Sequence, residues 1–148
     1  MSALPLPFCF QLLGIKLGDH LALPLLMPPV PAGFPSPAAD YIDQHLDLNE
    51  HLVSNPASTF FVRVVGESMT GDHIHPGDIL VVDRAQEPTT GRIVIAVVDG
   101  DFTVKRLRLN NNGRIFLDPA NPSFDAFEVP PDSDFQVWGV VTFIIHKA

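Results

Sequence analysis

The sequence is poor in positive charge. Its 148 residues include 9 Lys and Arg against 17 Asp and Glu, which gives a net charge of −8. Proteins that bind duplex DNA draw most of their affinity from Lys and Arg contacts to phosphates. We therefore expect no strong direct binding to nucleic acid, and any link to DNA should run through a protein partner.

Cysteine and long apolar runs are also scarce. Cys9 is the one cysteine, so the chain can form no internal disulfide bond, which suits a reducing compartment such as the cytoplasm. No run of about 18 apolar residues is free of charges and prolines, so the sequence predicts no membrane span. The length and the hydrophobic content of 46% favour one folded domain with a core.

Proline is concentrated near the N-terminus. Residues 1–39 carry only two formally charged side chains, Lys16 and Asp19, and 8 of the 15 prolines. Because proline lacks an N–H donor, this density disfavours helices and inner strands. We interpret residues 1–39 as an extended, mobile arm that precedes a domain spanning residues 40–148.

A secretory signal peptide is the alternative interpretation of this arm. Val30-Pro31-Ala32 places small residues at the third and first positions before a bond at Ala32–Gly33. The first residues carry no basic charge, however, and Lys16, Asp19 and several prolines interrupt the apolar stretch. The arm makes a poor signal peptide, although a secreted β-domain processed by signal peptidase stays open as an alternative.

Strand signals dominate the rest of the chain. Short segments rich in β-branched and aromatic residues alternate with turns that contain Gly, Pro and Asn. These segments are 59–65, 79–83, 92–98, 102–109, 114–117, 124–129 and 135–145. The spacing of apolar residues predicts a single helical turn near 48–53. The pattern indicates a mostly β domain built as a small rolled or bent sheet.

The tetrapeptide Gly66-Glu67-Ser68-Met69 follows the first of these segments. A serine on a tight turn can expose its hydroxyl, and the glycine beside it allows a substrate to approach the backbone. Neighbouring N–H groups could stabilise an oxyanion. The plainer interpretation is a turn serine, because the residues lack the Gly-x-Ser-x-Gly pattern of hydrolases. On local sequence alone, the plainer interpretation is the stronger one.

Lys105 lies on a predicted hairpin around Asp99-Gly100, a dipeptide that favours a type I′ turn. Such a turn pairs Val94 with Lys105 and Ala96 with Thr103, so these residues share one face of the sheet. Both faces of the hairpin are largely apolar, which predicts that it is buried. A lysine there is unusual, because lysine is seldom buried without a partner.

Burial on this face would disfavour the ammonium form and lower the pKa of Lys105 below its ordinary value of ~10.4. A neutral amine can take a proton from a serine hydroxyl and activate it as a nucleophile. The alternative is a lysine whose stem follows the sheet so that its amine reaches solvent. The hairpin pattern alone leaves both interpretations open.

His73-Ile74-His75 suggests competing chemistries near Ser68. One imidazole could act as a general base, or the pair could bind a metal. The segment is rich in turn residues, and it has no third ligand at metal spacing and no cysteine nearby. We therefore interpret these histidines as solvated loop residues and predict neither a metal nor a cofactor.

Taken together, these motifs resemble the peptidase domain of the LexA/UmuD-type family of self-cleaving serine–lysine peptidases. The matching segments are Gly66 to Met69, Ile74 to Asp83, Gly91 to Lys105, Leu117 to Pro122 and Val137 to Val141. Residues 33–41, followed by Asp47-Leu48-Asn49, look like the region just after the self-cleavage bond of UmuD-type members. The resemblance covers about residues 32–145, but the proline-rich residues 1–30 depart from it.

The resemblance implies that Ser68 is the nucleophile, that Lys105 is the general base and that Ala32–Gly33 is the scissile bond. It implies a cytoplasmic homodimer whose self-cleavage is stimulated by a RecA filament on single-stranded DNA after DNA damage. The product, residues 33–148, would join a UmuC-type error-prone polymerase as the accessory subunit for translesion synthesis. No helix-turn-helix pattern precedes the domain, so a DNA-binding repressor is not expected. A non-catalytic interaction module with inert Ser68 and Lys105 is the remaining alternative.

Overall fold

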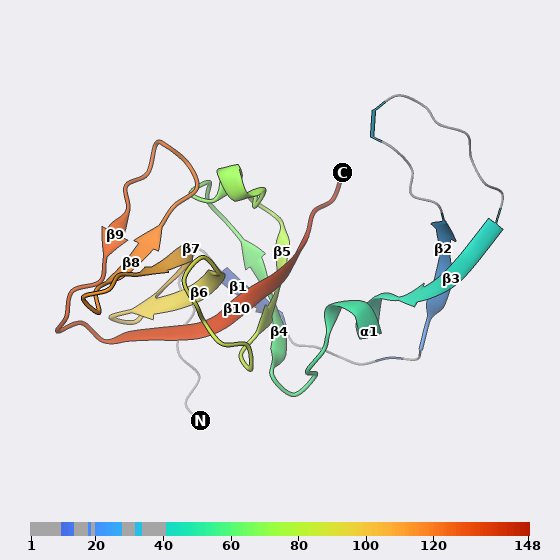
Figure 1. The fold of residues 1–148 in the computed structure, drawn as a ribbon, viewed down its shortest axis with the longest axis horizontal. Helices are drawn as coiled ribbons and strands as arrows, with labels where there is room; N and C mark the ends of the chain where they lie inside the picture. The colour runs from blue at the N-terminus through green and yellow to red at the C-terminus, as the bar shows by residue number, and fades with distance from the viewer. Residues whose placement is uncertain (1–9, 14–17, 19, 28–31, 34–40) are drawn as a thin grey trace. The chain divides into compact units, whose positions relative to one another are not determined.

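The computed structural model describes residues 10–13, 18, 20–27, 32–33 and 41–148 (Figure 1). The chain divides into two compact units: the smaller is Lys16–Ser54, and the larger combines Met1–Ile15 with Asn55–Ala148. Most of the predicted mobile arm, together with Cys9, lies outside the described residues. The boundary that we place between residues 39 and 40 therefore stays a prediction.

The larger unit contains an eight-stranded sheet in which every pair of neighbouring strands is antiparallel. The strand order is β1-β4-β5-β10-β6-β7-β8-β9. The strands are β1 (Phe10–Leu13), β4 (Thr59–Val64), β5 (Ile79–Asp83), β6 (Ile93–Val98), β7 (Asp101–Leu109), β8 (Ile115–Asp118), β9 (Phe127–Glu128) and β10 (Phe135–Ile145). The mostly β fold predicted from the sequence is confirmed.

The hairpin of β6 and β7 has the predicted register. Val94 pairs with Lys105 and Ala96 with Thr103. Asp99 and Gly100 both have positive φ angles, 49° and 86°, as a type I′ turn requires. Because a shift of one residue would turn every side chain to the opposite face, this turn decides which face carries Lys105.

Each face of this hairpin contributes to a separate apolar cluster. On one face, Ile95, Phe102 and Val104 pack in a cluster with residues of β4 and β5. On the other face, which also carries Lys105, Val94 and Ala96 pack with residues of β7, β8 and β10. The hairpin is therefore buried on both sides, as its continuous apolar sequence predicted.

The last strand, β10, lies in the interior of the sheet between β5 and β6 (Figure 1). Its Trp138 makes edge contacts with the rings of Phe60 and Phe102, at centroid distances of 5.0 and 4.9 Å. The adjacent Gly139 has no room for a side chain, because an added Cβ would lie 2.5 Å from a methyl group of Val82. Much of the apolar content of β10 is thus used within the sheet.

One strand is shorter than the sequence predicted. We expected a strand over residues 124–129, but only Phe127–Glu128 pair with β8. The preceding residues form a turn, in which Asn121 Oδ1 accepts the N–H of Ser123 and Asn121 O accepts the N–H of Phe124. Asparagine stabilises such turns through its side chain, and this preference outweighs the aromatic residue at position 124.

The smaller unit has β2 (Ala22–Met27) paired with β3 (Tyr41–Asp47), followed by the short helix α1 (Leu48–Leu52). The helical turn was predicted, and Asp47 caps it by accepting the N–H of Asn49 at 2.9 Å. Neither strand was predicted. Pro24 is tolerated in β2 because a two-stranded sheet leaves one edge of each strand unpaired.

Candidate active site

Ser68 lies on the turn that follows β4, just before the short helical turn η1 (Thr70–Asp72). Gly66 starts the turn at φ 93°, a conformation that glycine adopts without steric penalty. The next side chain, Met69, is only 1% exposed and packs in the larger apolar cluster. Met69 anchors one side of the turn in the core, while Ser68 itself is half-buried.

The loop after β8 (residues 119–122) holds the serine turn by hydrogen bonds. Ala120 N–H donates to Ser68 O at 2.8 Å, and Gly71 N–H donates to Ala120 O at 2.5 Å. The side-chain amide of Asn121 donates to Glu67 O at 2.8 Å. A side chain at position 71 would collide with this loop, since an added Cβ would lie 2.4 Å from Ala120 O. The backbone around Ser68 is therefore fixed from two sides.

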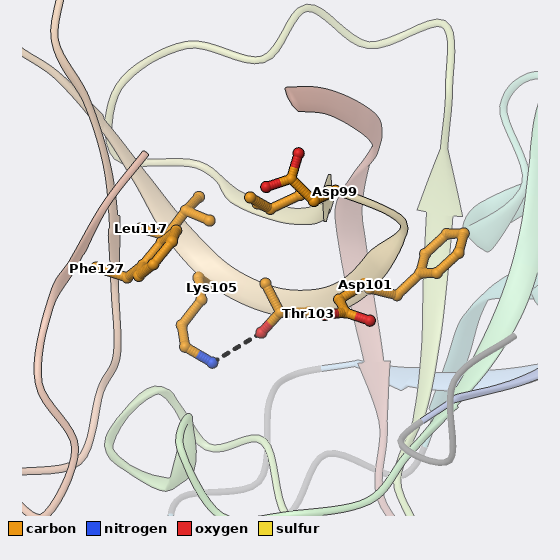
Figure 2. Close-up of a pocket in the computed structure, with 8 residues that line it drawn as sticks. Asp99, Asp101, Thr103, Lys105, Leu117 and Phe127 are labelled. Carbon is orange, nitrogen blue, oxygen red and sulfur yellow. Dashed lines mark hydrogen bonds between the residues drawn. The ribbon is translucent and has the colours of Figure 1, made fainter. Parts of the chain in front are cut away.

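Lys105 reaches Ser68 from strand β7. Its Nζ lies 2.8 Å from Ser68 Oγ, and it also lies 2.9 Å from Thr103 Oγ1 and 3.2 Å from Val104 O. Figure 2 shows the lysine and Thr103 side by side on the same strand. The sequence placed Thr103 and Lys105 on one face, but their mutual contact was not predicted.

A pocket of about 350 Å³ opens beside these polar groups. Leu117 and Phe127 form apolar walls next to Lys105, and the hairpin turn brings the carboxylates of Asp99 and Asp101 near the pocket (Figure 2). A peptide side chain could enter such a space next to the serine–lysine pair. Apolar walls with a few convergent polar groups are typical of ligand-binding pockets.

An ion pair also connects the serine turn to the lysine strand. Arg106, next to Lys105, approaches Asp72 Oδ2 with its Nη2 at 2.9 Å and its Nε at 3.1 Å. Arg106 donates a further hydrogen bond to Gly91 O. Asp72 lies within η1, four residues after the serine. No local pattern in the sequence indicates this pair, because the two residues lie 34 positions apart.

The histidines near Ser68 in sequence are not part of this arrangement. Among the described residues, neither His73 nor His75 makes a hydrogen bond to Ser68. His75 instead lies near Asp78 and His146, with its ring 5.5 Å from that of His146. The geometry therefore favours Lys105 over either histidine as the base for the serine.

Ala32 and Gly33, the predicted scissile pair, are both exposed and lie between β2 and β3 in the smaller unit. An exposed position suits a bond that must enter a catalytic groove. The roles of Ala32, Gly33, Ser68 and Lys105 in cleavage stay predictions.

The comparison with protein families gives a match over residues 24–142 to the Peptidase S24-like family. The chain belongs to this family. The S24-like match includes the serine turn, the lysine hairpin and the predicted cleavage bond. The expectation of a peptidase-type domain is therefore confirmed at the level of the family.

Several curated proteins are similar to this S24-like chain. Protein SamA of Salmonella typhimurium strain LT2 is 51% identical over 124 residues, covering 84% of this chain and 85% of SamA. Protein MucA of Escherichia coli is 44% identical over 122 residues, 82% of each chain. The LexA repressor of Xylella fastidiosa strain M23 is 38% identical over 128 residues, 86% of this chain but 59% of the repressor. Within the described part of the S24-like chain, no helix is long and apolar enough to cross a membrane.

Proposed function

We propose that this chain cleaves itself once, between Ala32 and Gly33, with Ser68 as nucleophile and Lys105 as general base. The observation that carries the proposal is the 2.8 Å contact between Lys105 Nζ and Ser68 Oγ, next to a pocket of about 350 Å³. Membership of the Peptidase S24-like family supports the same chemistry.

The proposed mechanism uses Lys105 as a neutral amine. A neutral amine has two N–H groups and one lone pair, whereas an ammonium has three N–H groups and no lone pair. Thr103 Oγ1 and Val104 O can accept the two N–H groups, which leaves the lone pair for the hydroxyl of Ser68. Thr103 is then a positioning residue that orients the base toward the nucleophile.

The reaction proceeds in two balanced steps. Ser68 Oγ attacks the carbonyl carbon of Ala32 while its proton moves to Lys105 Nζ, and the lysine then protonates the departing amine of Gly33. Water next attacks the resulting ester with Lys105 again as the base, which releases residues 1–32 and restores Ser68. The backbone N–H of Ser68 can stabilise the oxyanion, since no acceptor is paired with it among the described residues.

The cellular role that we propose is SOS mutagenesis in the cytoplasm. The product, residues 33–148, would act in a homodimer as the accessory subunit of a UmuC-type error-prone polymerase. A RecA filament on single-stranded DNA would stimulate the cleavage. This proposal rests on the resemblance of the motifs to UmuD-type proteins and on the net charge of −8, which favours action through protein partners rather than direct DNA binding.

Intact mass measurement tests the cleavage. Pure full-length protein incubated at alkaline pH should convert into fragments 1–32 and 33–148. Ser68→Ala should stay intact, because it has no nucleophile. Ser123→Ala, which removes an exposed hydroxyl elsewhere, should cleave like the wild type. A fragment that begins at Gly33 in pure Ser68→Ala protein would contradict the assignment.

The same measurement separates the alternative functions. An inert interaction module would stay intact in every variant, including the wild type. A secreted domain would lose its N-terminus only when signal peptidase is added, and Ser68→Ala would then be cleaved as fast as the wild type.

A further inference from the structure

A second group of chemically active side chains lies outside the serine–lysine site. His75 and Asp78 belong to the turn before β5, and His146 follows the end of β10. Antiparallel pairing of β10 with β5 brings the two segments together, although Asp78 and His146 are 68 positions apart in the sequence. One ligand atom from each of the three residues lies within 4.8 Å of the other two.

Asp78 forms the rigid centre of this group. Its side chain is 3% exposed, and its Oδ2 accepts the backbone N–H of His75 at 2.8 Å. Its Oδ1 lies 2.6 Å from His146 Nδ1. The group therefore contains a buried carboxylate with a partner on each oxygen.

The two imidazoles have room to adjust around this carboxylate. The side chains of His75 and His146 are 47% and 58% exposed, and their ring centroids lie 5.5 Å apart. His75 Nδ1 lies 3.9 Å from Asp78 Oδ2. Ligand atoms bound at about 2.0–2.1 Å to a tetrahedral ion are separated by roughly 3.3 Å. The three candidate ligand atoms already lie within 4.8 Å of one another. Small rotations of exposed rings would reach that geometry.

We propose that His75, Asp78 and His146 bind one divalent transition-metal ion of the zinc type. Two imidazole nitrogens and one carboxylate oxygen suit Zn²⁺, whereas Mg²⁺ and Ca²⁺ prefer oxygen ligands alone. The bound ion would tie the segment after β10 to the turn that precedes β5. This site does not include Ser68 or Lys105. Its expected effect is therefore to fix the position of the C-terminal segment and not to take part in peptide cleavage.

Calorimetric titration of tag-free full-length protein with ZnCl₂ tests the proposal. The wild type should bind one ion per chain, and His75→Ala and His146→Ala should each lose affinity by about tenfold or more. His73→Asn is the matched control: it removes a neighbouring imidazole, tolerates the positive φ of 65° at that position, and should bind like the wild type. Because His75 and His146 are exposed, their variants should keep the wild-type circular dichroism spectrum.

Visible absorption of bound Co²⁺ is a second test of the same site. Co²⁺ added to the wild type should give visible absorption bands that Zn²⁺ abolishes and that the His146→Ala variant lacks. The proposal is overturned if the wild type shows no saturable binding at micromolar concentrations. It is equally overturned if binding survives in both histidine variants, for instance because His20, Asp47 and Glu50 of the smaller unit hold the ion and only His20→Ala removes it.

Discussion

At the scale of single residues, Lys105 owes its position to its neighbours on β7. Thr103 shares its face of the strand, and Val104 offers the carbonyl of the intervening peptide. With these two acceptors and Ser68 Oγ, three oxygen atoms surround Nζ. A half-buried lysine is tolerated here because its Nζ has hydrogen-bond partners.

The first prediction concerns this lysine as the base. Only the neutral amine can accept the serine proton, so the rate of self-cleavage should rise with pH and level off once the amine is deprotonated. Lys105→Arg should not cleave, because a guanidinium stays protonated. Lys105→Ala should not cleave either, since it has no base. Fragment yield, followed by intact mass over a pH series, measures these rates.

A histidine variant supplies the control for this prediction. His73→Asn should follow the wild-type pH profile, because His73 makes no hydrogen bond to Ser68 among the described residues. The contrary result would be a pH profile with a midpoint of ~6.5, the ordinary pKa of histidine. If that midpoint disappeared when a histidine was replaced, the catalytic role would belong to that histidine.

At the scale of elements, the nucleophile turn depends on the loop after β8. Ala120 and Asn121 make the hydrogen bonds that hold the backbone at Glu67, Ser68 and Gly71. The ion pair between Arg106 and Asp72 connects the same turn to β7. None of these hydrogen bonds involves Ser68 Oγ or Lys105 Nζ, and neither does the ion pair. These residues therefore act by positioning Ser68 relative to Lys105.

The second prediction tests this positioning. Gly71→Ala would force its Cβ against Ala120 O, at a starting distance of 2.4 Å, so the two loops must separate. We expect a loss of stability on the order of 1–3 kcal/mol, as for other overpacked sites. We also expect slower self-cleavage, because the serine moves away from the lysine. Chemical denaturation and cleavage rate measure the two effects.

A pair of asparagine variants separates positioning from general instability. Asn121→Ala removes the amide that donates to Glu67 O and should slow cleavage more than it lowers stability. Asn111→Ala changes an exposed residue of the turn between β7 and β8 and should affect neither. Equal cleavage rates in the two asparagine variants would argue against a positioning role for the loop after β8.

At the scale of the whole molecule, Asp83 connects the segment before β4 to the segment after β5. Its carboxylate accepts hydrogen bonds from the side chains of Asn55 and Ser58, before β4, and from the N–H of Ala85, after β5. Burial alone would raise the pKa of Asp83, yet these hydrogen bonds outweigh burial and lower that pKa. The ionised carboxylate thus contributes to the stability of the fold.

The third prediction follows from the sign of this shift. A carboxyl group whose pKa is lower in the folded state adds stability that is fully present above the unfolded pKa and is lost as pH falls through the folded pKa. The free energy of unfolding should therefore decrease as the pH is lowered below about 4. Asp83→Asn should be less stable at neutral pH and should lose less on acidification. Urea denaturation at several pH values measures both changes.

The control for the acid prediction is Asp132→Asn, a change at an exposed loop residue that should leave the pH dependence as in the wild type. Asp78 also has a lowered pKa, so Asp83→Asn should retain part of the acid sensitivity. An unchanged acid slope in Asp83→Asn would show that Asp83 does not supply the linkage.

The fourth prediction concerns assembly. The family resemblance implies a homodimer, and the interior position of β10 accounts for much of the apolar run in that strand. The larger unit still exposes several large apolar side chains: Val65, Leu109, Phe124, Phe127 and Ile145. We predict a homodimer before and after cleavage. Analytical ultracentrifugation at micromolar concentration checks this, and a monomer alone would count against it.

The sequence by itself determined the elements whose signals are local. Segments rich in β-branched and aromatic residues, bounded by turn residues, located the strands from β4 to β8 and β10, and the Asp99-Gly100 turn determined which face of β7 carries Lys105. The same logic failed for β2 and β3, where prolines and mixed polarity hide the pairing. It also overestimated β9, because the side chain of Asn121 stabilises a turn that aromatic content does not reveal.

Only the tertiary structure decided which distant residues meet. Strand pairing brings together residues that are 37 to 68 positions apart in the sequence. It produces the 2.8 Å contact of Ser68 with Lys105, the hydrogen bonds of Ala120 and Asn121 to the serine turn, and the contact of His146 with Asp78. Local sequence encodes strand and turn preference through backbone sterics and side-chain packing. The partner of each strand depends on the burial of both sheet faces at once, and that is a property of the whole fold.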